Sequence, residues 1–390
     1  MQATADEEIK KMSIKFHWRM LQGGEEQGGS KSRALGSSLS PTGLPDLMPQ
    51  IEFCKTAEAV GIDGLLVDIG AAKPDPIVTT AAFGLATKKI AFIVAARSGL
   101  QSPTTFVQQI NTLSNLIGGD RLLLNIVAGH SPKEQRYYGD FLDHDQRYAR
   151  TEDFLAVCHR FWRDDGPVDY AGRFYQIEGG VLNTSFSAQG RQHPLLFIAG
   201  GSDTCRDLAV SQGDIWMRLA DTPEAVGGTA APVLAAGKQL GLRLAVIVRP
   251  TRAEALAAAR TLIGGLDPKD REASMEKKFV GNSDSVSMKT TFALAEKEWL
   301  TPTLWTGAIR THGAPAACLV GDPDEVAGAF LDYKQVGVTH FILSGWPKQA
   351  EMVFFGNEVI PRVRAMEAND ETRTNKVAAL SPDSAQEIGV

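Results

Sequence analysis

Residues 194–207 read PLLFIAGGSDTCRD, an apolar run that ends in a Gly-Gly-Ser turn and continues into a sequence able to start a helix. A helix N-terminus has unpaired backbone N–H groups and a positive dipole end, and both suit a phosphate. The turn is equally compatible with a tight strand-to-helix connection in which glycine relieves backbone strain and binds nothing. It is not the dinucleotide-binding fingerprint, because Gly201 is followed by Ser-Asp-Thr-Cys and the third glycine of that motif is missing.

This run is one of eight apolar stretches of strand length that alternate with helical stretches along the chain. They span residues 13–20, 64–68, 90–97, 122–128, 195–199, 214–219, 242–249 and 340–344. Eight alternating units favour an α/β fold, a parallel (β/α)8 TIM barrel closed on itself. Helix-start signals at Ser102-Pro103, Thr251 to Glu254 and Asp322-Pro323 fit this pattern.

The domain prediction is a single barrel over residues 13–366 with flexible tails at 1–12 and 367–390. Two segments interrupt the alternation. Residues 22–45 are rich in glycine and serine and predict a long loop, or lid, at the active-site end of the barrel. Residues 262–317, between the seventh and eighth strands, are longer than one crossover helix needs and predict an insertion that builds or covers the catalytic mouth.

Composition limits the classes of partner. The chain has 390 residues, of which 43% are hydrophobic, and a net charge of −6, so it can bury a large core but has no basic field for nucleic acid. No apolar run is long enough to span a membrane. The four cysteines are far apart and form no CxxC pair, so we expect reduced thiols in a cytoplasmic protein.

Two polar features occur in the region of residues 122–150. Asn125 lies in an otherwise aliphatic run, where an unpaired carboxamide would cost a few kcal/mol, about 1–3, and we favour a ligand as its partner. The sequence Asp143-His144-Asp145 suggests a metal cluster, but consecutive residues cannot all face one ion, so we expect a helix start and no metal site. Arg147 and Tyr148 then lie in the first turn of that helix, where they can reach a phosphate.

Taken together, these pieces resemble the bacterial luciferase-like flavin monooxygenases, and within them the FMNH2-dependent alkanesulfonate monooxygenase branch. The matching pieces are Phe16-His17-Trp18, Ser102-Pro103-Thr104, Asn125 to Gly129, Leu142 to Tyr148, Gly200 to Asp203, Arg243-Leu244 before Val246 to Arg249, Leu319 to Asp322, and Leu343-Ser344-Gly345 before Pro347. They cover about residues 13 to 365 in the order of the family.

The resemblance implies a two-component monooxygenase. Reduced FMN would come from a separate NAD(P)H-dependent flavin reductase, O2 would add at the flavin C4a position, and the resulting (hydro)peroxide would oxygenate a small organic substrate. It also implies a homo-oligomer, a dimer or a tetramer. Carried over by position, the residues fall into three sets: Tyr148, Gly201 and Ser202 with Asn125 and Ala128 for FMN; Arg243, Arg310 and His312 for catalysis; and Trp18, Lys73 and Trp346 for substrate.

The chain departs from the desulfonating members at several of these positions. Lys73 aligns with their cysteine, Ala245 with a histidine and Trp346 with a tyrosine, while their mobile-loop arginine aligns with His312, two residues from Arg310. Ala245 and Trp346 predict a roomier, more apolar pocket, and hence a substrate larger than a simple alkanesulfonate. Lys73 and Trp346 are equally compatible with a surface lysine and a core filler.

Three other functions stay open at this point: ordinary alkanesulfonate desulfonation, a deazaflavin (F420)-dependent oxidoreductase of the same fold, and a noncatalytic flavin-binding protein.

Overall fold

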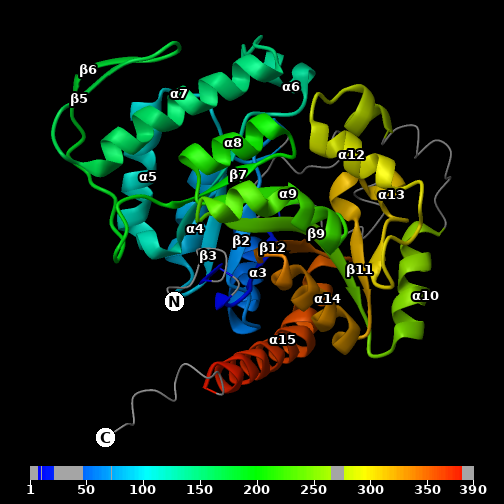
Figure 1. The fold of residues 1–390 in the computed structure, drawn as a ribbon. Coiled ribbons are helices and arrows are strands. Elements are labelled where there is room, and N and C mark those ends of the chain that lie inside the picture. The colour runs from blue at the N-terminus through cyan, green and yellow to red at the C-terminus, as the bar shows by residue number, and fades with distance from the viewer. Residues whose placement is uncertain (1–7, 10, 22–46, 72, 265–275, 380–390) are drawn as a thin grey trace, which may run out of the picture.

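The computed structural model describes residues 8–9, 11–21, 47–71, 73–264 and 276–379, and its centre is a closed parallel barrel (Figure 1). Each barrel strand pairs in parallel with the next, and the last pairs with the first. The barrel strands are β1 (Lys15–Arg19), β2 (Gly64–Val67), β3 (Ala91–Arg97), β4 (Leu122–Val127), β7 (Leu195–Ala199), β8 (Ile215–Leu219), β9 (Gln239–Val248) and β12 (Val338–Ser344). All eight coincide with the predicted runs, so the predicted TIM barrel is confirmed.

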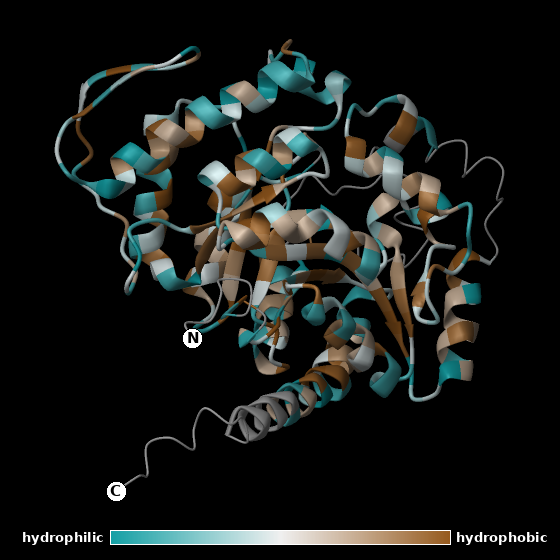
Figure 2. Ribbon diagram, in the orientation of Figure 1, coloured by the Kyte–Doolittle hydropathy of each residue, from teal (hydrophilic) through white to brown (hydrophobic). Residues whose placement is uncertain are grey.

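Helices surround the barrel, and the hydropathy colouring shows apolar residues concentrated in the strands and polar residues on outward helix faces (Figure 2). These helices are α3 (Leu47–Ala59), α4 (Pro76–Leu85), α5 (Pro103–Ile117), α6 (Pro132–Tyr137), α7 (His144–Arg163), α8 (Asp203–Gln212), α9 (Pro223–Ala235), α10 (Arg252–Ile263), α14 (Pro323–Gln335) and α15 (Lys348–Ala379). The predicted starts are confirmed, because Ser102, Thr251 and Asp322 cap α5, α10 and α14 with their side chains.

Strand alternation divides the barrel residues into two sets. On β1, Phe16 and Trp18 point outward into the main core between strands and helices, where Trp18 packs against Phe355 of α15. The intervening residues, His17 and Arg19, point into the barrel, where His17 contacts Phe197 of β7.

Several elements lie outside the simple alternation. A short antiparallel hairpin of β5 (Val168–Ala171) and β6 (Gln176–Gly180) follows α7. Between β9 and β12 the chain forms α12 (Val286–Leu294), β10 (Leu304–Trp305), α13 (Ile309–His312) and β11 (Cys318–Gly321). Strand β11 pairs in parallel with the second half of β9, and β10 pairs antiparallel with β11.

The structure differs from the domain prediction at both ends of the described chain. Ile9 is buried in the main core, so the predicted N-terminal tail is shorter than twelve residues. The predicted C-terminal tail starts at residue 367, but Glu367 still lies within helix α15. Its carboxylate accepts hydrogen bonds from the Lys334 side chain and from the backbone N–H of Ile14. The predicted lid at residues 22–45 and residues 265–275 of the insertion lie outside the described residues. No helix in the described part combines the length and the apolar character needed to cross a bilayer.

Candidate functional site

The C-terminal ends of the barrel strands form the mouth, which in (β/α)8 enzymes carries the active site. Arg19 ends β1, Arg97 ends β3, and Asp68 directly follows β2. Arg243 projects into the barrel from β9 opposite Leu219 of β8. The mouth is thus lined by charged side chains above the apolar layers of the barrel.

The Gly-Gly-Ser turn lies between β7 and α8. Ser202 is the N-cap of α8, and its hydroxyl accepts from the backbone N–H of Cys205 at 3.2 Å. The Tyr148 hydroxyl, from the first turns of α7, reaches the same place and hydrogen-bonds with the side chains of Ser202 and Cys205. Burial raises the pKa of Tyr148, so the phenol stays protonated and keeps a donor at this turn.

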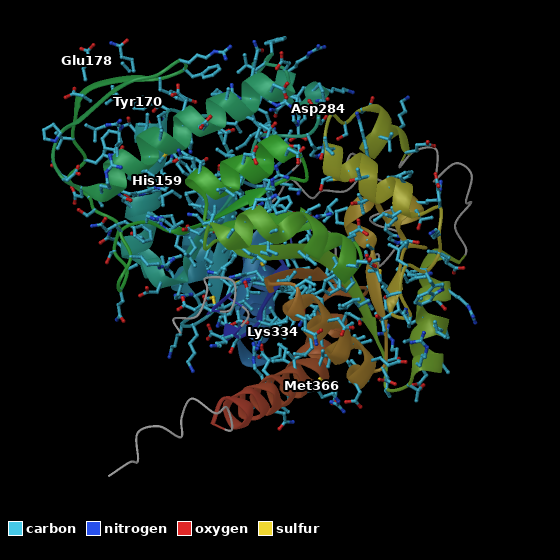
Figure 3. The ribbon with its side chains drawn as sticks, in the orientation of Figure 1. His159, Tyr170, Glu178, Asp284, Lys334 and Met366 are labelled. Carbon is cyan, nitrogen blue, oxygen red and sulfur yellow. The ribbon has the colours of Figure 1, made fainter. Side chains whose placement is uncertain are left out.

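Helix α12 closes the other side of this turn. A Cβ added at Gly201 would lie 2.8 Å from the Ser287 hydroxyl oxygen, so only glycine fits here without movement of α12. Asp284 lies in the loop before α12 (Figure 3). It holds this loop, because its carboxylate accepts from Arg147 Nη2 at 2.6 Å and its backbone N–H donates to the His130 carbonyl. The N-termini of α8 and α12 therefore both lie beside Gly201, and Arg147 is engaged in holding them there.

Asn125 and Ala128 lie on and just beyond β4. Asn125 is buried, and its Oδ1 has no hydrogen-bond partner among the described residues. An orphaned buried carboxamide oxygen is costly, by about 1–3 kcal/mol, and is typical of a site that a ligand completes. The Ala128 carbonyl is already occupied, because it accepts from Gln135 Nε2 and Arg147 Nε, each at 3.0 Å.

A cluster of three cations surrounds the Asp68 carboxylate. Arg19 Nε lies 2.6 Å and Lys73 Nζ 3.1 Å from Oδ2, and Arg243 Nη1 lies 3.9 Å from Oδ1. We call these four residues the mouth cluster. It brings together the two sequence-predicted residues Lys73 and Arg243, and Lys73 is an ion-paired side chain rather than an ordinary surface lysine.

The cations of the mouth cluster keep the Asp68 carboxylate charged. Burial alone would raise the pKa of Asp68, but Lys73, Arg19 and Arg243 together hold it well below its usual value, so the carboxylate is ionised near neutral pH. Burial lowers the pKa of Lys73, while Asp68 opposes that shift. Counted over these four described residues alone, the cluster has more positive than negative charge.

The predicted residues of the insertion lie elsewhere. Within the described chain, the Arg310 guanidinium donates to the Ala295 carbonyl at 3.3 Å and lies over the Phe292 ring at 5.8 Å, and it makes no ion pair with the mouth cluster. His312 is buried, with its ring edge-on to Trp346 at 5.1 Å. The structure thus brings His312 and Trp346 together, but separately from Arg310.

Two expectations about substrate contacts are wrong. Trp18 is completely buried and faces α15, because β1 alternation turns its neighbour Arg19 into the barrel instead. Ala245 has no exposed surface and packs with Trp346, Trp305 and Cys318 in one apolar cluster, so side chains fill the room expected beside it. Trp346 accordingly packs as a core residue.

Sequence reasoning missed Arg19 and Asp68, the partners of Lys73 and Arg243. The alternation of β1 could have predicted Arg19. Phe16 and Trp18 share the outward face, so Arg19 must point into the barrel. The expected helix start at Asp143 is confirmed, because its carboxylate caps α7 in a capping box with Gln146.

Comparisons with known proteins agree with this architecture. The solved structure of EDTA monooxygenase from Chelativorans sp. BNC1 is similar over 91% of this chain and 94% of its own, with a TM-score of 0.71 and 23% identity. A long-chain alkane monooxygenase (91% and 92%, TM-score 0.68, 17% identity) and an F420-dependent secondary alcohol dehydrogenase (90% and 99%, TM-score 0.63, 18% identity) share the fold. The family model described as luciferase-like monooxygenase matches residues 16–340. The chain therefore belongs to the luciferase-like monooxygenase family, as the sequence pieces predicted.

Proposed function

We propose that this protein is the oxygenating component of a two-component monooxygenase that uses reduced FMN and O2 to oxygenate an organic anion. The observation that carries the cofactor part is the convergence of Tyr148, Ser202 and the α12 N-terminus on Gly201, where a side chain would not fit. Two helix N-termini and two hydroxyl groups form a donor set suited to a phosphate.

The remaining residues fit a flavin. Gly201, Ser202 and Tyr148 would hold the phosphate, and Asn125, whose Oδ1 is otherwise orphaned, would meet a polar edge of the ring system beside Ala128. When bound, reduced FMN would supply the two electrons with which O2 is activated. A separate flavin reductase would supply that reduced FMN.

The mouth cluster supports the substrate part of the proposal. Lys73 and Arg243 offer positive charge at the barrel mouth, while Asp68 orients them by ion pairing. A cleft with this charge attracts anions and stabilises negative charge that develops during a reaction. Side chains fill the space beside Ala245, so this position gives no extra room for a large substrate. The proposed substrate is therefore defined by its charge and not by its size.

The test compares anionic and neutral chains of equal length, with FMNH2 supplied chemically and O2 present. We expect product from octanesulfonate or octanoate, with sulfite release reporting on the sulfonate, and little product from 1-octanol. Lys73→Gln should raise KM for the anions by about tenfold, since it removes one charge-assisted contact of about 1.4 kcal/mol or more.

Lys88→Gln, at an exposed lysine outside the mouth, is the matched control and should leave KM unchanged. Equal turnover of neutral and anionic chains, together with an unchanged KM in Lys73→Gln, would contradict the assignment of the mouth cluster to substrate binding.

A further inference from the structure

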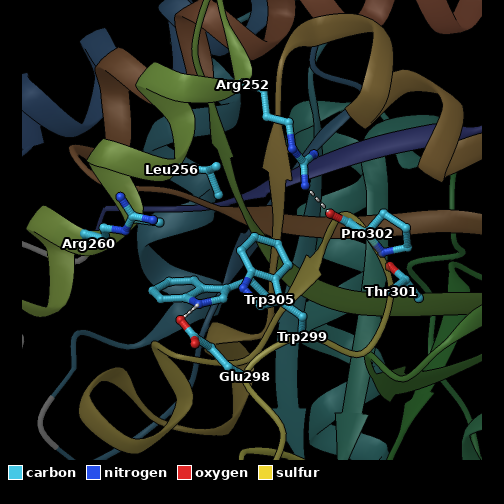
Figure 4. Close-up of a pocket in the computed structure, with 9 residues that line it drawn as sticks. Arg252, Leu256, Arg260, Glu298, Trp299, Thr301, Pro302 and Trp305 are labelled. Atoms are coloured by element: carbon cyan, nitrogen blue, oxygen red, sulfur yellow. Dashed lines mark hydrogen bonds between the residues drawn. The ribbon is translucent and has the colours of Figure 1, made fainter.

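We infer that a pocket on the outer side of the barrel, away from the mouth, binds a planar aromatic anion. The cavity has a volume of about 360 Å³ and lies between α10 and the segment that leads into β10 (Figure 4). Its lining residues are Arg252, Leu256, Ala259, Arg260, Glu298, Trp299, Thr301, Pro302 and Trp305. This size falls in the lower part of the range for small-molecule sites.

Two tryptophans form one wall of the pocket. Trp299 and Trp305 face each other across an antiparallel bridge, with ring centroids 6.4 Å apart and an interplanar angle of 43°. Trp305 is buried, and its Nε1 donates to Glu298 at 3.2 Å, which fixes the indole. Trp299 is only partly buried, so one fixed and one accessible indole offer flat apolar surface to a planar ring.

Two arginines face this wall from α10. Arg252 lies over the Trp299 ring at 6.0 Å and is already paired with Glu325 at 2.9 Å and with the Pro302 carbonyl. Arg260 is exposed, and among the described residues no carboxylate lies within ion-pair distance of its guanidinium. Figure 4 shows Arg260 and the indoles around the same opening.

The charges in the pocket indicate the sign of the ligand. Glu298 keeps its negative charge on the side where it accepts from the neutral Trp305 indole, and Arg252 is paired with Glu325. Arg260 is within ion-pair distance of no carboxylate among the described residues, so its side of the rim is positive. An aromatic ring against Trp299 with a carboxylate or sulfonate toward Arg260 satisfies both walls. None of the lining residues belongs to the mouth cluster or to the Gly201 turn, so this site is separate from the proposed reaction.

The probe is 2-naphthoate, titrated into the full-length protein by isothermal calorimetry, with cyclohexanecarboxylate and 2-naphthalenemethanol as probes that lack the aromatic ring or the charge. We expect 2-naphthoate to bind at least tenfold more tightly than either. Arg260→Gln and Trp299→Leu should each weaken it by about tenfold, while Arg163→Gln, at an exposed arginine of α7, should not.

Titration in the Lys73→Gln background separates this site from the mouth, because that variant removes the contact that the proposed function assigns to organic anions. The binding that remains should still be lost in Arg260→Gln, whether or not the proposed monooxygenase function is correct. Arg260→Gln keeps the inference testable even if Trp299→Leu fails to fold, since the arginine side chain is exposed. The inference is overturned if 2-naphthoate does not bind at millimolar concentration, if Arg260→Gln binds it as tightly as wild type, or if only Lys73→Gln loses it.

Discussion

A pair of histidines inside the barrel predicts a large loss of stability in mild acid. His17 Nε2 and His340 Nδ1 are 2.9 Å apart, and the two ring planes are nearly parallel, with an interplanar angle of 2°. His340 Nε2 lies 3.0 Å from Gln239 Oε1, an acceptor, so His340 donates there and accepts from the His17 N–H. This arrangement needs a neutral His340, because its Nδ1 accepts, while burial keeps His17 neutral. Burial, with a smaller contribution from Lys15, lowers the pKa of His17 to about 3, and burial and His17 lower the pKa of His340 well below its usual value.

The sign and size of the effect follow from proton linkage. Below pH 6.5 the unfolded chain protonates both rings and the folded chain protonates neither, so the free energy of unfolding falls as the pH falls. At pH 5.0 each ring lowers the free energy of unfolding by about 2 kcal/mol, and the pair lowers it by about 4 kcal/mol. This is a large part of a typical free energy of unfolding of about 5–15 kcal/mol.

Urea unfolding at pH 8 and pH 5 measures this loss. The double variant His17→Gln/His340→Gln starts from a lower stability at pH 8 but should lose about 4 kcal/mol less between the two pH values. The reasoning is refuted if the double variant shows the same pH dependence as the wild-type protein.

Three further predictions concern the proposed site. Tyr148→Phe should weaken FMNH2 binding by about 1.5–3 kcal/mol, the value of one hydrogen bond to a charged phosphate, and an unchanged affinity in anaerobic fluorescence titration would put the phosphate elsewhere. Arg243→Ala should lower kcat by more than it lowers FMNH2 affinity, because the charge it stabilises develops during the reaction; full product formation with coupled flavin consumption would show that the active site is misplaced. Asp68→Asn should lower the free energy of unfolding by about 3–5 kcal/mol, because it leaves the buried cations uncompensated, and a loss below about 1 kcal/mol in urea unfolding would argue against the mouth cluster.

The barrel could be predicted because the signals for its strands and helices lie within short stretches of sequence. Each strand is a short apolar run bounded by helix signals, and the caps at Ser102, Thr251 and Asp322 depend only on residues three positions away. The additional strands β10 and β11 were missed because β10 has two residues and β11 is recognisable mainly by its pairing with β9.

The geometry of the candidate site was predicted only in part, for a physical reason. The Gly201 turn and Tyr148 were found because a strand-turn-helix unit carries its own signal, but the mouth cluster joins β1, β2 and β9 across long sequence separations. Trp18 was assigned to substrate from the position of a three-residue motif. Strand alternation turns Trp18 outward and points Arg19 into the barrel instead.

The central claim is that the Gly201 turn holds reduced FMN for a reaction with O2. Anaerobic fluorescence titration of the purified protein with FMNH2 and with reduced F420, in the wild type and in Ser202→Ala, tests it most directly. We predict that FMNH2 binds at least tenfold more tightly than reduced F420, that Ser202→Ala weakens FMNH2 binding by about 1.5–3 kcal/mol, and that admitting air oxidises the bound flavin. Preference for reduced F420, or FMNH2 binding that is indifferent to Ser202→Ala, would contradict the proposed cofactor and its site.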